Sequence, residues 1–93
     1  MASLKELVKD PSTIIVDVRS PMEFAMEHIP NAINIPVDQI PYKTAEFKSF
    51  KNPVVVYCRS GARSSMALGL LQQNGITNVY NGGGIGDMQF LLN

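Results

Sequence analysis

Cys58 is the only cysteine of the chain, and its surroundings suggest chemistry more than packing. The apolar run Val54–Tyr57 leads directly into it, as a buried strand would. A helical pattern with apolar residues at spacings of three and four then runs to about Gln73. Between them lie two basic and three small residues: Arg59, Ser60, Gly61, Ala62 and Arg63.

This position predicts an anion-binding loop with Cys58 at its base. Ligands of open parallel sheets bind beyond the carboxyl ends of the strands. A short loop of small residues can turn successive backbone N–H groups inward, and the following helix adds positive charge at its N-terminus. Arg59 and Arg63 add two formal charges. All of these groups lower the pKa of a thiol, so we expect Cys58 to be a reactive thiolate.

The structural alternative is a cysteine that only packs. A lone cysteine commonly behaves as a small buried hydrophobe. We favour the functional interpretation because packing gives no reason for a small-residue loop, two arginines and a helix start directly after Cys58.

Composition limits the other possibilities. The 93 residues fit one domain, residues 1–93, and 45% hydrophobic content supplies one core. One cysteine excludes an internal disulfide, a CxxC pair and a cysteine-rich zinc site. The formal net charge of zero gives no basic footprint for nucleic acid. We expect no membrane segment and no secretory signal in the first residues, and therefore a cytoplasmic protein.

Apolar β-branched runs alternate with helical patterns along the chain. Expected strands cover residues 13–18, 32–35, 54–57 and 78–80. Expected helices start after the capping serines Ser3 and Ser20, and cover residues 44–50, 62–73 and 85–92. Residues 36–41 are expected to be irregular and residues 82–84 to form a tight turn. The pattern predicts an α/β domain with a mainly parallel sheet.

Four further polar side chains need an interpretation. Asp17 and Arg19 follow a strand end, where they could tune the site, although a structural ion pair is the stronger expectation. His28 precedes Ile29-Pro30 in a turn, which favours a structural role over that of a general base. Asp87 is expected to be a solvated carboxylate.

The chain resembles the rhodanese-like family over nearly its whole length. The motifs that carry the resemblance occur in the family's order: Asp17-Val18-Arg19 with Glu23-Phe24, His28-Ile29-Pro30 with residues 32–36, residues 58–64, and Gly83-Gly84-Ile85. The resemblance implies a three-layer α/β domain with a mainly parallel sheet of four to five strands flanked by helices.

The resemblance also implies a reaction. Cys58 would take the outer sulfur of thiosulfate, release sulfite, and pass its persulfide sulfur to cyanide or to a thiol. Backbone amides of residues 59–63 would stabilise the persulfide, and Arg59 or Arg63 would hold the sulfonate of the donor. The expected partners are a small sulfur-containing anion and a thiol or protein acceptor. No metal or organic cofactor is implied.

The sequence departs from the family pattern away from the loop. Glu27 and Asn31 stand where glycines are common, and Met88 stands where tryptophan is common. Asparagine tolerates the left-handed backbone conformation, so the turn at Asn31 can survive. The family's first strand would lie before Met1.

Two other functions remain open from the sequence. Related cysteine phosphatases and arsenate reductases place five residues between cysteine and arginine, whereas four separate Cys58 from Arg63. The shorter loop suits a sulfur atom better than a tetrahedral phosphate. A non-catalytic binding module of the same fold is the second alternative, and the presence of Cys58 counts against it.

Overall fold

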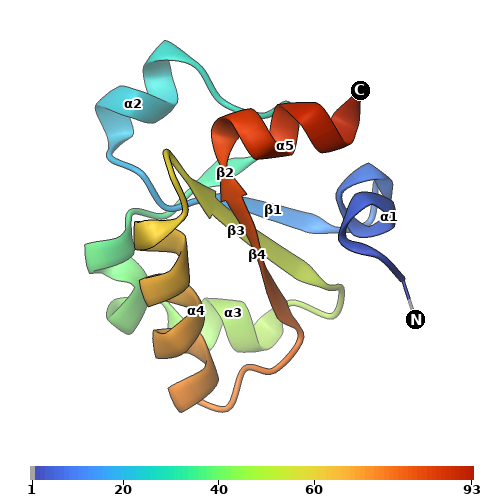
Figure 1. Ribbon diagram of the computed structural model, residues 1–93. Helices are drawn as coiled ribbons and strands as arrows, with labels where there is room; N and C mark the ends of the chain where they lie inside the picture. Colours follow the sequence, from blue (N-terminus) through green and yellow to red (C-terminus); the bar gives the residue numbers. More distant parts are fainter. Residues whose placement is uncertain (1) are drawn as a thin grey trace.

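The computed structural model describes residues 2–93, which alternate between strands and helices (Figure 1). The strands are β1 (Ile14–Asp17), β2 (Ile33–Asn34), β3 (Val54–Cys58) and β4 (Val79–Gly84). The α-helices are α1 (Leu4–Lys9), α2 (Pro21–Met26), α3 (Thr44–Ser49), α4 (Ala62–Gln73) and α5 (Ile85–Leu92), and η1 (Val37–Tyr42) is a 3₁₀ helix. Met1, the start of the stretch in which we expect no signal, lies outside the described residues.

All strand pairings of the described sheet are parallel, in the order β2-β1-β3-β4. Ile14 pairs with Val54, which in turn pairs with Val79, so the carboxyl ends of β1 and β3 meet at one edge. The predicted α/β domain with four parallel strands is confirmed. The ladder of β2 is two residues long and β1 covers four residues, both shorter than the apolar runs that predicted them.

Alternation along β3 divides the core between the two faces of the sheet. Val54, Val56 and Cys58 belong to the cluster that contains Phe47, Ile40, Ala67 and Leu71 of α3, η1 and α4. Val55 and Tyr57 belong to the cluster that contains Leu7, Val8 and Met88 of α1 and α5. Figure 1 shows these helices on opposite sides of the sheet. Cys58 therefore faces the α4 layer, directly below the start of that helix.

Local sequence signals account for the helix starts. The side chains of Ser3 and Ser20 each accept a hydrogen bond from the backbone N–H of the glutamate three residues later. The carboxylate of that glutamate accepts the backbone N–H of the serine, which confirms both capping boxes. Asn31 has a φ of 70°, the left-handed conformation expected of it. α4 begins after Gly61, whose φ of 104° favours glycine.

Two predictions of irregular structure were wrong. Residues 36–41, expected to be irregular, form most of η1, where Gln39 N–H donates to Pro36 and Lys43 N–H donates to Ile40. Residues 82–84, expected to form a tight turn, are the last part of β4. Glycine pattern alone suggested a turn, but these glycines pair with β3 around an irregularity after Val56.

Among residues 2–93, no helix has the length and apolar character needed to cross a membrane. No group of three or more His, Cys, Asp or Glu side chains in that range is placed to hold a metal ion.

Candidate active site

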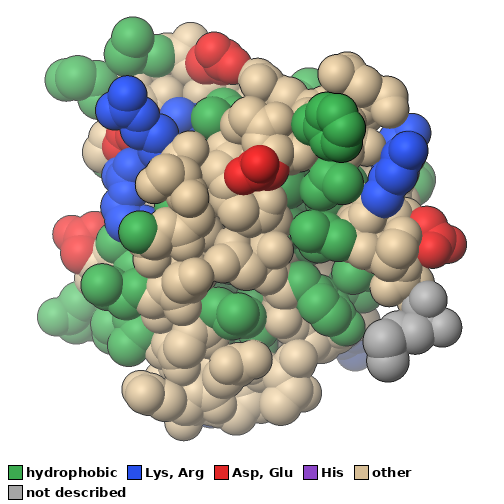
Figure 2. All heavy atoms as spheres, in the orientation of Figure 1, with side chains coloured by type: hydrophobic (Ala, Val, Ile, Leu, Met, Phe, Trp, Pro, Cys, Tyr) green, Lys and Arg blue, Asp and Glu red, His purple; other side chains and the backbone are tan. Residues whose placement is uncertain are grey.

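The thiol of Cys58 lies at the carboxyl end of the central strand β3, under the loop that leads into α4. The residue is only 1% exposed. Arg59, Ser60 and Ala62 of the loop are exposed around it. Basic side chains, drawn in blue, lie beside this loop and the start of α4 (Figure 2). The buried sulfur therefore lies beneath an exposed rim that includes the charge of Arg59.

Two groups contact the sulfur directly. Gly61 N–H donates a hydrogen bond to Cys58 Sγ over 3.0 Å. The hydroxyl of Ser64, in the first turn of α4, lies 3.4 Å from the same sulfur. Both come from the segment that follows Cys58, because the loop turns back over the strand end. The loop thus places one backbone N–H and one hydroxyl against the sulfur.

These contacts change the acidity of the thiol. Burial acts to raise the pKa of Cys58, but hydrogen bonds from the Ser64 hydroxyl and from the backbone of Ser64, Ser60 and Gly61 outweigh it and lower that pKa. The main cause of the lowering is local hydrogen bonding, whereas the sequence interpretation also relied on the two arginines. The arrangement favours a thiolate held in a site with little solvent.

Glycines of β4 form the wall behind the loop. Gly84 pairs with Cys58 in the sheet, and a Cβ there would come within 3.0 Å of the Arg59 carbonyl carbon and 3.2 Å of Ser60 Cα. Gly83, with a φ of 83°, lies against Gly61. Residues with side chains would push the loop away from the strand end. The glycine run therefore serves close packing of two backbones.

The two loop arginines differ in their surroundings. Arg59 is exposed. Arg63 forms a two-point ion pair with Glu23 of α2, with Nη1–Oε1 and Nη2–Oε2 distances of 2.7 and 3.0 Å. It also lines a groove of about 610 Å³ between the start of α2 and η1. Arg63 thus lies beside the loop, and its guanidinium already has an anionic partner.

Asp17 and Arg19 form a buried structural pair. The Arg19 guanidinium donates to both carboxylate oxygens of Asp17, at 2.6 to 3.0 Å, and to the backbone carbonyl of Glu27 at 2.6 Å. Its Cζ lies 5.8 Å from the centre of the Tyr57 ring, whose hydroxyl accepts the N–H of Ile29. Hydrogen bonding to Asp17 raises the pKa of Arg19 against the effect of burial. The pair supports the strand end next to Cys58 from the opposite face.

His28 and Asp87 are both engaged away from the sulfur. The His28 ring stacks on Phe24 at 3.8 Å, and its Nδ1 lies 2.8 Å from the Phe24 carbonyl oxygen. Asp87, expected to be merely solvated, instead accepts the Gly84 N–H at 2.9 Å and caps α5. That cap fixes the turn from β4 into α5 beside the loop.

A comparison of this sequence with protein families gives a clear result. The rhodanese-like domain matches residues 1–85. The chain belongs to the rhodanese-like family. The loop geometry, the parallel sheet and the matched range all agree with that assignment, and the predicted resemblance is confirmed.

Named relatives of this rhodanese-like domain include sulfurtransferases. It is 40% identical over 77 residues to a sulfurtransferase of Allochromatium vinosum, covering 83% of this chain and 71% of that protein. It is 39% identical over 74 residues to the thiosulfate sulfurtransferase PspE of Escherichia coli, covering 78% and 71%. A tRNA uridine(34) hydroxylase of Hamiltonella defensa is 36% identical, but the chain spans only 23% of it. These relatives support a rhodanese-type sulfurtransferase.

Solved structures agree on the fold. The domain superimposes with a TM-score of 0.73 on a rhodanese with anions from Escherichia coli, at 34% identity, covering 81% of this chain and 89% of that one. A human single-domain sulfurtransferase gives a TM-score of 0.75 at 27% identity, covering 94% and 88%.

Three residues of the rhodanese-like site escaped the sequence interpretation. The sequence places Ser64, Glu23 and Gly84 in motifs of the family, Glu23 also in a capping box and Gly84 in a turn, but it assigns none of them a role at the sulfur. The interval of six residues from Cys58 to Ser64 could have pointed to Ser64, because the first turn of α4 returns to the strand end. No local signal predicts that Glu23 meets Arg63, 40 residues away.

Proposed function

We propose that this rhodanese-like domain carries sulfane sulfur on Cys58 as a persulfide and that thiosulfate serves as a donor. The observation that carries the proposal is the 3.0 Å hydrogen bond from Gly61 N–H to the Cys58 sulfur, inside a loop that reaches Arg63 after four residues. An N–H aimed at this position stabilises a thiolate before reaction. Inward-facing amides of the same loop can hold the terminal sulfur of a persulfide afterwards.

The first half-reaction transfers one sulfur atom. The Cys58 thiolate attacks the outer sulfur of thiosulfate and forms the new S–S bond. The S–S bond of thiosulfate breaks, its electron pair leaves with sulfite, and the negative charge of the thiolate passes to the terminal sulfur of the persulfide. The step uses no external oxidant and consumes no proton.

The second half-reaction restores the thiolate. Cyanide, or the thiolate of an acceptor, attacks the terminal persulfide sulfur, and the electron pair of the S–S bond returns to Cys58. Thiocyanate or an acceptor persulfide leaves. We assign a small thiol or a protein thiol as the cellular acceptor, because the exposed rim of the loop at Arg59, Ser60 and Ala62 gives access from solvent. A free catalytic thiol suits a reducing compartment, so we place the protein in the cytoplasm.

Roles within the loop follow from this chemistry. Cys58 is the nucleophile, and the backbone of Ser60 and Gly61 supports its anionic forms. Arg59 provides an exposed positive charge at the entrance. Asp17 and Arg19 support the strand end without contacting the sulfur. Sulfite is a stable anion as it leaves, so the step needs no general acid.

The test is incubation with thiosulfate, followed by intact mass and sulfite measurement. The wild type should gain the mass of one sulfur atom and release one equivalent of sulfite, and Cys58→Ala should do neither. Ser49→Ala, a change in an exposed serine of α3, is the matched control. Sulfur gained equally by wild type and Cys58→Ala would refute the proposal. Phosphate release from an aryl phosphate at a comparable rate would favour the phosphatase alternative instead.

A further inference from the structure

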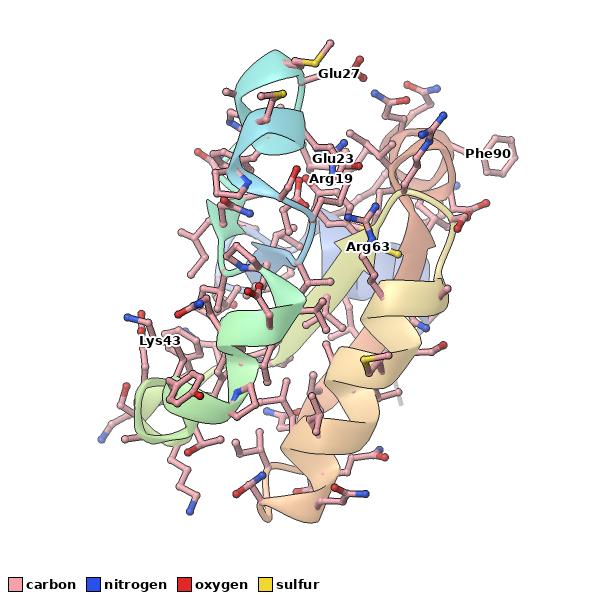
Figure 3. All side chains as sticks on the ribbon, turned by 90° about the vertical axis from the view of Figure 1, so that its left-hand side faces the viewer. Arg19, Glu23, Glu27, Lys43, Arg63 and Phe90 are labelled. Atoms are coloured by element: carbon pink, nitrogen blue, oxygen red, sulfur yellow. The ribbon has the colours of Figure 1, made fainter. Side chains whose placement is uncertain are left out.

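Arg63 lies beside the Cys58 loop, where it could bind a donor anion, but its guanidinium is already paired with Glu23. The Arg63 side chain extends from the start of α4 toward Glu23 of α2, and Figure 3 shows the two groups facing each other with Arg19 next to them. Both guanidinium Nη atoms are used, one on each carboxylate oxygen. A two-point pair of this kind satisfies the face of arginine that would otherwise bind a planar or tetrahedral anion.

We propose that Glu23 is a specificity-determining residue that competes with small anionic donors for Arg63 and so weakens their binding to the Cys58 loop. This inference rests on the proposed sulfur transfer, and it concerns which donors are accepted. A donor that presents no negative charge to the Arg63 guanidinium does not compete with Glu23, so Glu23 does not affect its binding.

The charges around the loop support the assignment. Asp17 neutralises Arg19 and Glu23 neutralises Arg63, and these are the two ion pairs found among residues 2–93. Arg63 also interacts electrostatically with the sulfur. Hydrogen bonding to Glu23 is the main cause that raises the pKa of Arg63, and the negative charge of the Cys58 thiolate raises it further. Removal of the Glu23 charge therefore leaves Arg63, like the exposed Arg59, without a carboxylate partner at the loop in the described part of the chain.

Glu23 is held in place before any donor arrives. Its Oε1 accepts hydrogen bonds from the backbone N–H of Ser20 at 3.1 Å and from the Ser20 hydroxyl at 3.0 Å. The carboxylate therefore loses little freedom when it pairs with Arg63, which strengthens it as a competitor. The same hydrogen bonds can be made by glutamine, which is common at this place in capping boxes.

The pair is nevertheless open to exchange. The side chains of Arg63 and Glu23 are 36% and 29% exposed. No residue of α2 is fully buried, and Phe24 packs against the core only as a partly buried side chain. Arg63 also lines a groove of about 610 Å³ together with Val18 and Ser20. An anion can therefore approach Arg63 and take the place of the carboxylate.

The experiment compares anionic and neutral reagents on Glu23→Gln. Cys58 is alkylated with iodoacetate, an anion, and with iodoacetamide, its neutral counterpart, and the ratio of the two rates is measured. Glu23→Gln should raise this ratio about two- to fivefold, the size expected for one partly exposed charge. The same variant should lower the half-saturating thiosulfate concentration by a similar factor. Glu6→Gln, which changes the other capping-box glutamate, is the matched control and should change neither quantity.

Arg63→Gln and the double variant Glu23→Gln/Arg63→Gln complete a double-mutant cycle for the ion pair. Arg63→Gln should lower the iodoacetate ratio, because the Glu23 charge is then unmatched, and the double variant should return to within about twofold of wild type. An unchanged ratio in Glu23→Gln, or in Arg63→Gln if the first variant fails to fold, overturns the proposal. Alkylation does not need sulfur transfer. A wild type that releases no sulfite therefore refutes the proposed function, while the rate ratios still decide the role of Glu23.

Discussion

The Ser64 hydroxyl oxygen lies 3.4 Å from the Cys58 sulfur and also within reach of two carbonyl oxygens, those of Gly61 at 3.1 Å and Gly83 at 3.4 Å. A hydroxyl has one proton to donate. While Cys58 is a thiol, its S–H can point at the Ser64 oxygen and the hydroxyl can donate to a carbonyl. Once Cys58 ionises, the hydroxyl can turn and donate to the thiolate. The hydrogen bond that the Ser64 hydroxyl donates thereby depends on whether Cys58 is a thiol or a thiolate.

Ser64→Ala should therefore raise the pKa of Cys58, because the thiolate loses a donor while burial continues to oppose its charge. At neutral pH the alkylation rate with iodoacetamide should fall by about tenfold or more, the size expected for the loss of a hydrogen bond to a charged group. The measurement is the alkylation rate against pH. Ser65→Ala, which changes the exposed neighbour that contacts Asn81, is the control. An unshifted pH profile in Ser64→Ala would contradict this role.

Gly84→Ala should disrupt sulfur transfer more than stability. The added methyl would meet the backbone of Arg59 and Ser60, which cannot move without displacing the loop from Cys58. We expect at least a tenfold loss in sulfite release from thiosulfate, with the sheet still formed by circular dichroism. Gly69→Ala in α4 is the control, because its Cβ meets nothing within 4 Å. That change should stabilise the helix by about 0.5–1 kcal/mol. Equal activity of both variants would show that the loop tolerates the methyl group.

Asp17→Asn should destabilise the fold strongly. It leaves the Arg19 guanidinium buried without its counter-charge, and breaking a buried pair in this way costs about 3–5 kcal/mol. The measurement is urea unfolding followed by circular dichroism. Asp38→Asn, a change in an exposed carboxylate of η1, should alter the free energy of unfolding by less than about 0.5 kcal/mol. A loss below about 1 kcal/mol in Asp17→Asn would mean that the pair contributes little.

Glu23 should make stability depend on acid pH. Pairing with Arg63 is the main cause that lowers the pKa of Glu23, from 4.5 to about 2. Because the folded pKa is the lower one, this stabilisation is fully present above about pH 4.5 and is lost as pH falls toward about 2. The free energy of unfolding should fall less steeply over this range in Glu23→Gln than in wild type. Glu46→Gln, an exposed change in α3, should keep the wild-type slope.

Much of the site follows from local sequence alone. Val54–Tyr57 is apolar and β-branched, so it forms the central strand, and the small residues after Cys58 allow the sharp turn into α4. Ser20 and Glu23 are three residues apart, which is enough to define a capping box. These features depend on neighbours in the chain, and local steric and hydrogen-bonding rules determine them.

The conformation of residues 82–84 and the partner of Arg63 depend on contacts between segments that are distant in the sequence. The turn expected at residues 82–84 is a strand, because those glycines allow β4 and the Cys58 loop to approach closely, and that contact joins segments about 25 residues apart. The partner of Arg63 is likewise set by the tertiary fold, which brings Glu23 of α2 to a guanidinium 40 residues away in the chain. The sequence by itself determined that a nucleophilic cysteine stands at a strand end in an amide-rich loop. Only the packing of distant segments decided that the glycines of β4 lie against the Cys58 loop and that Arg63 is already paired with Glu23, because a charge responds to neighbours in space and not in sequence.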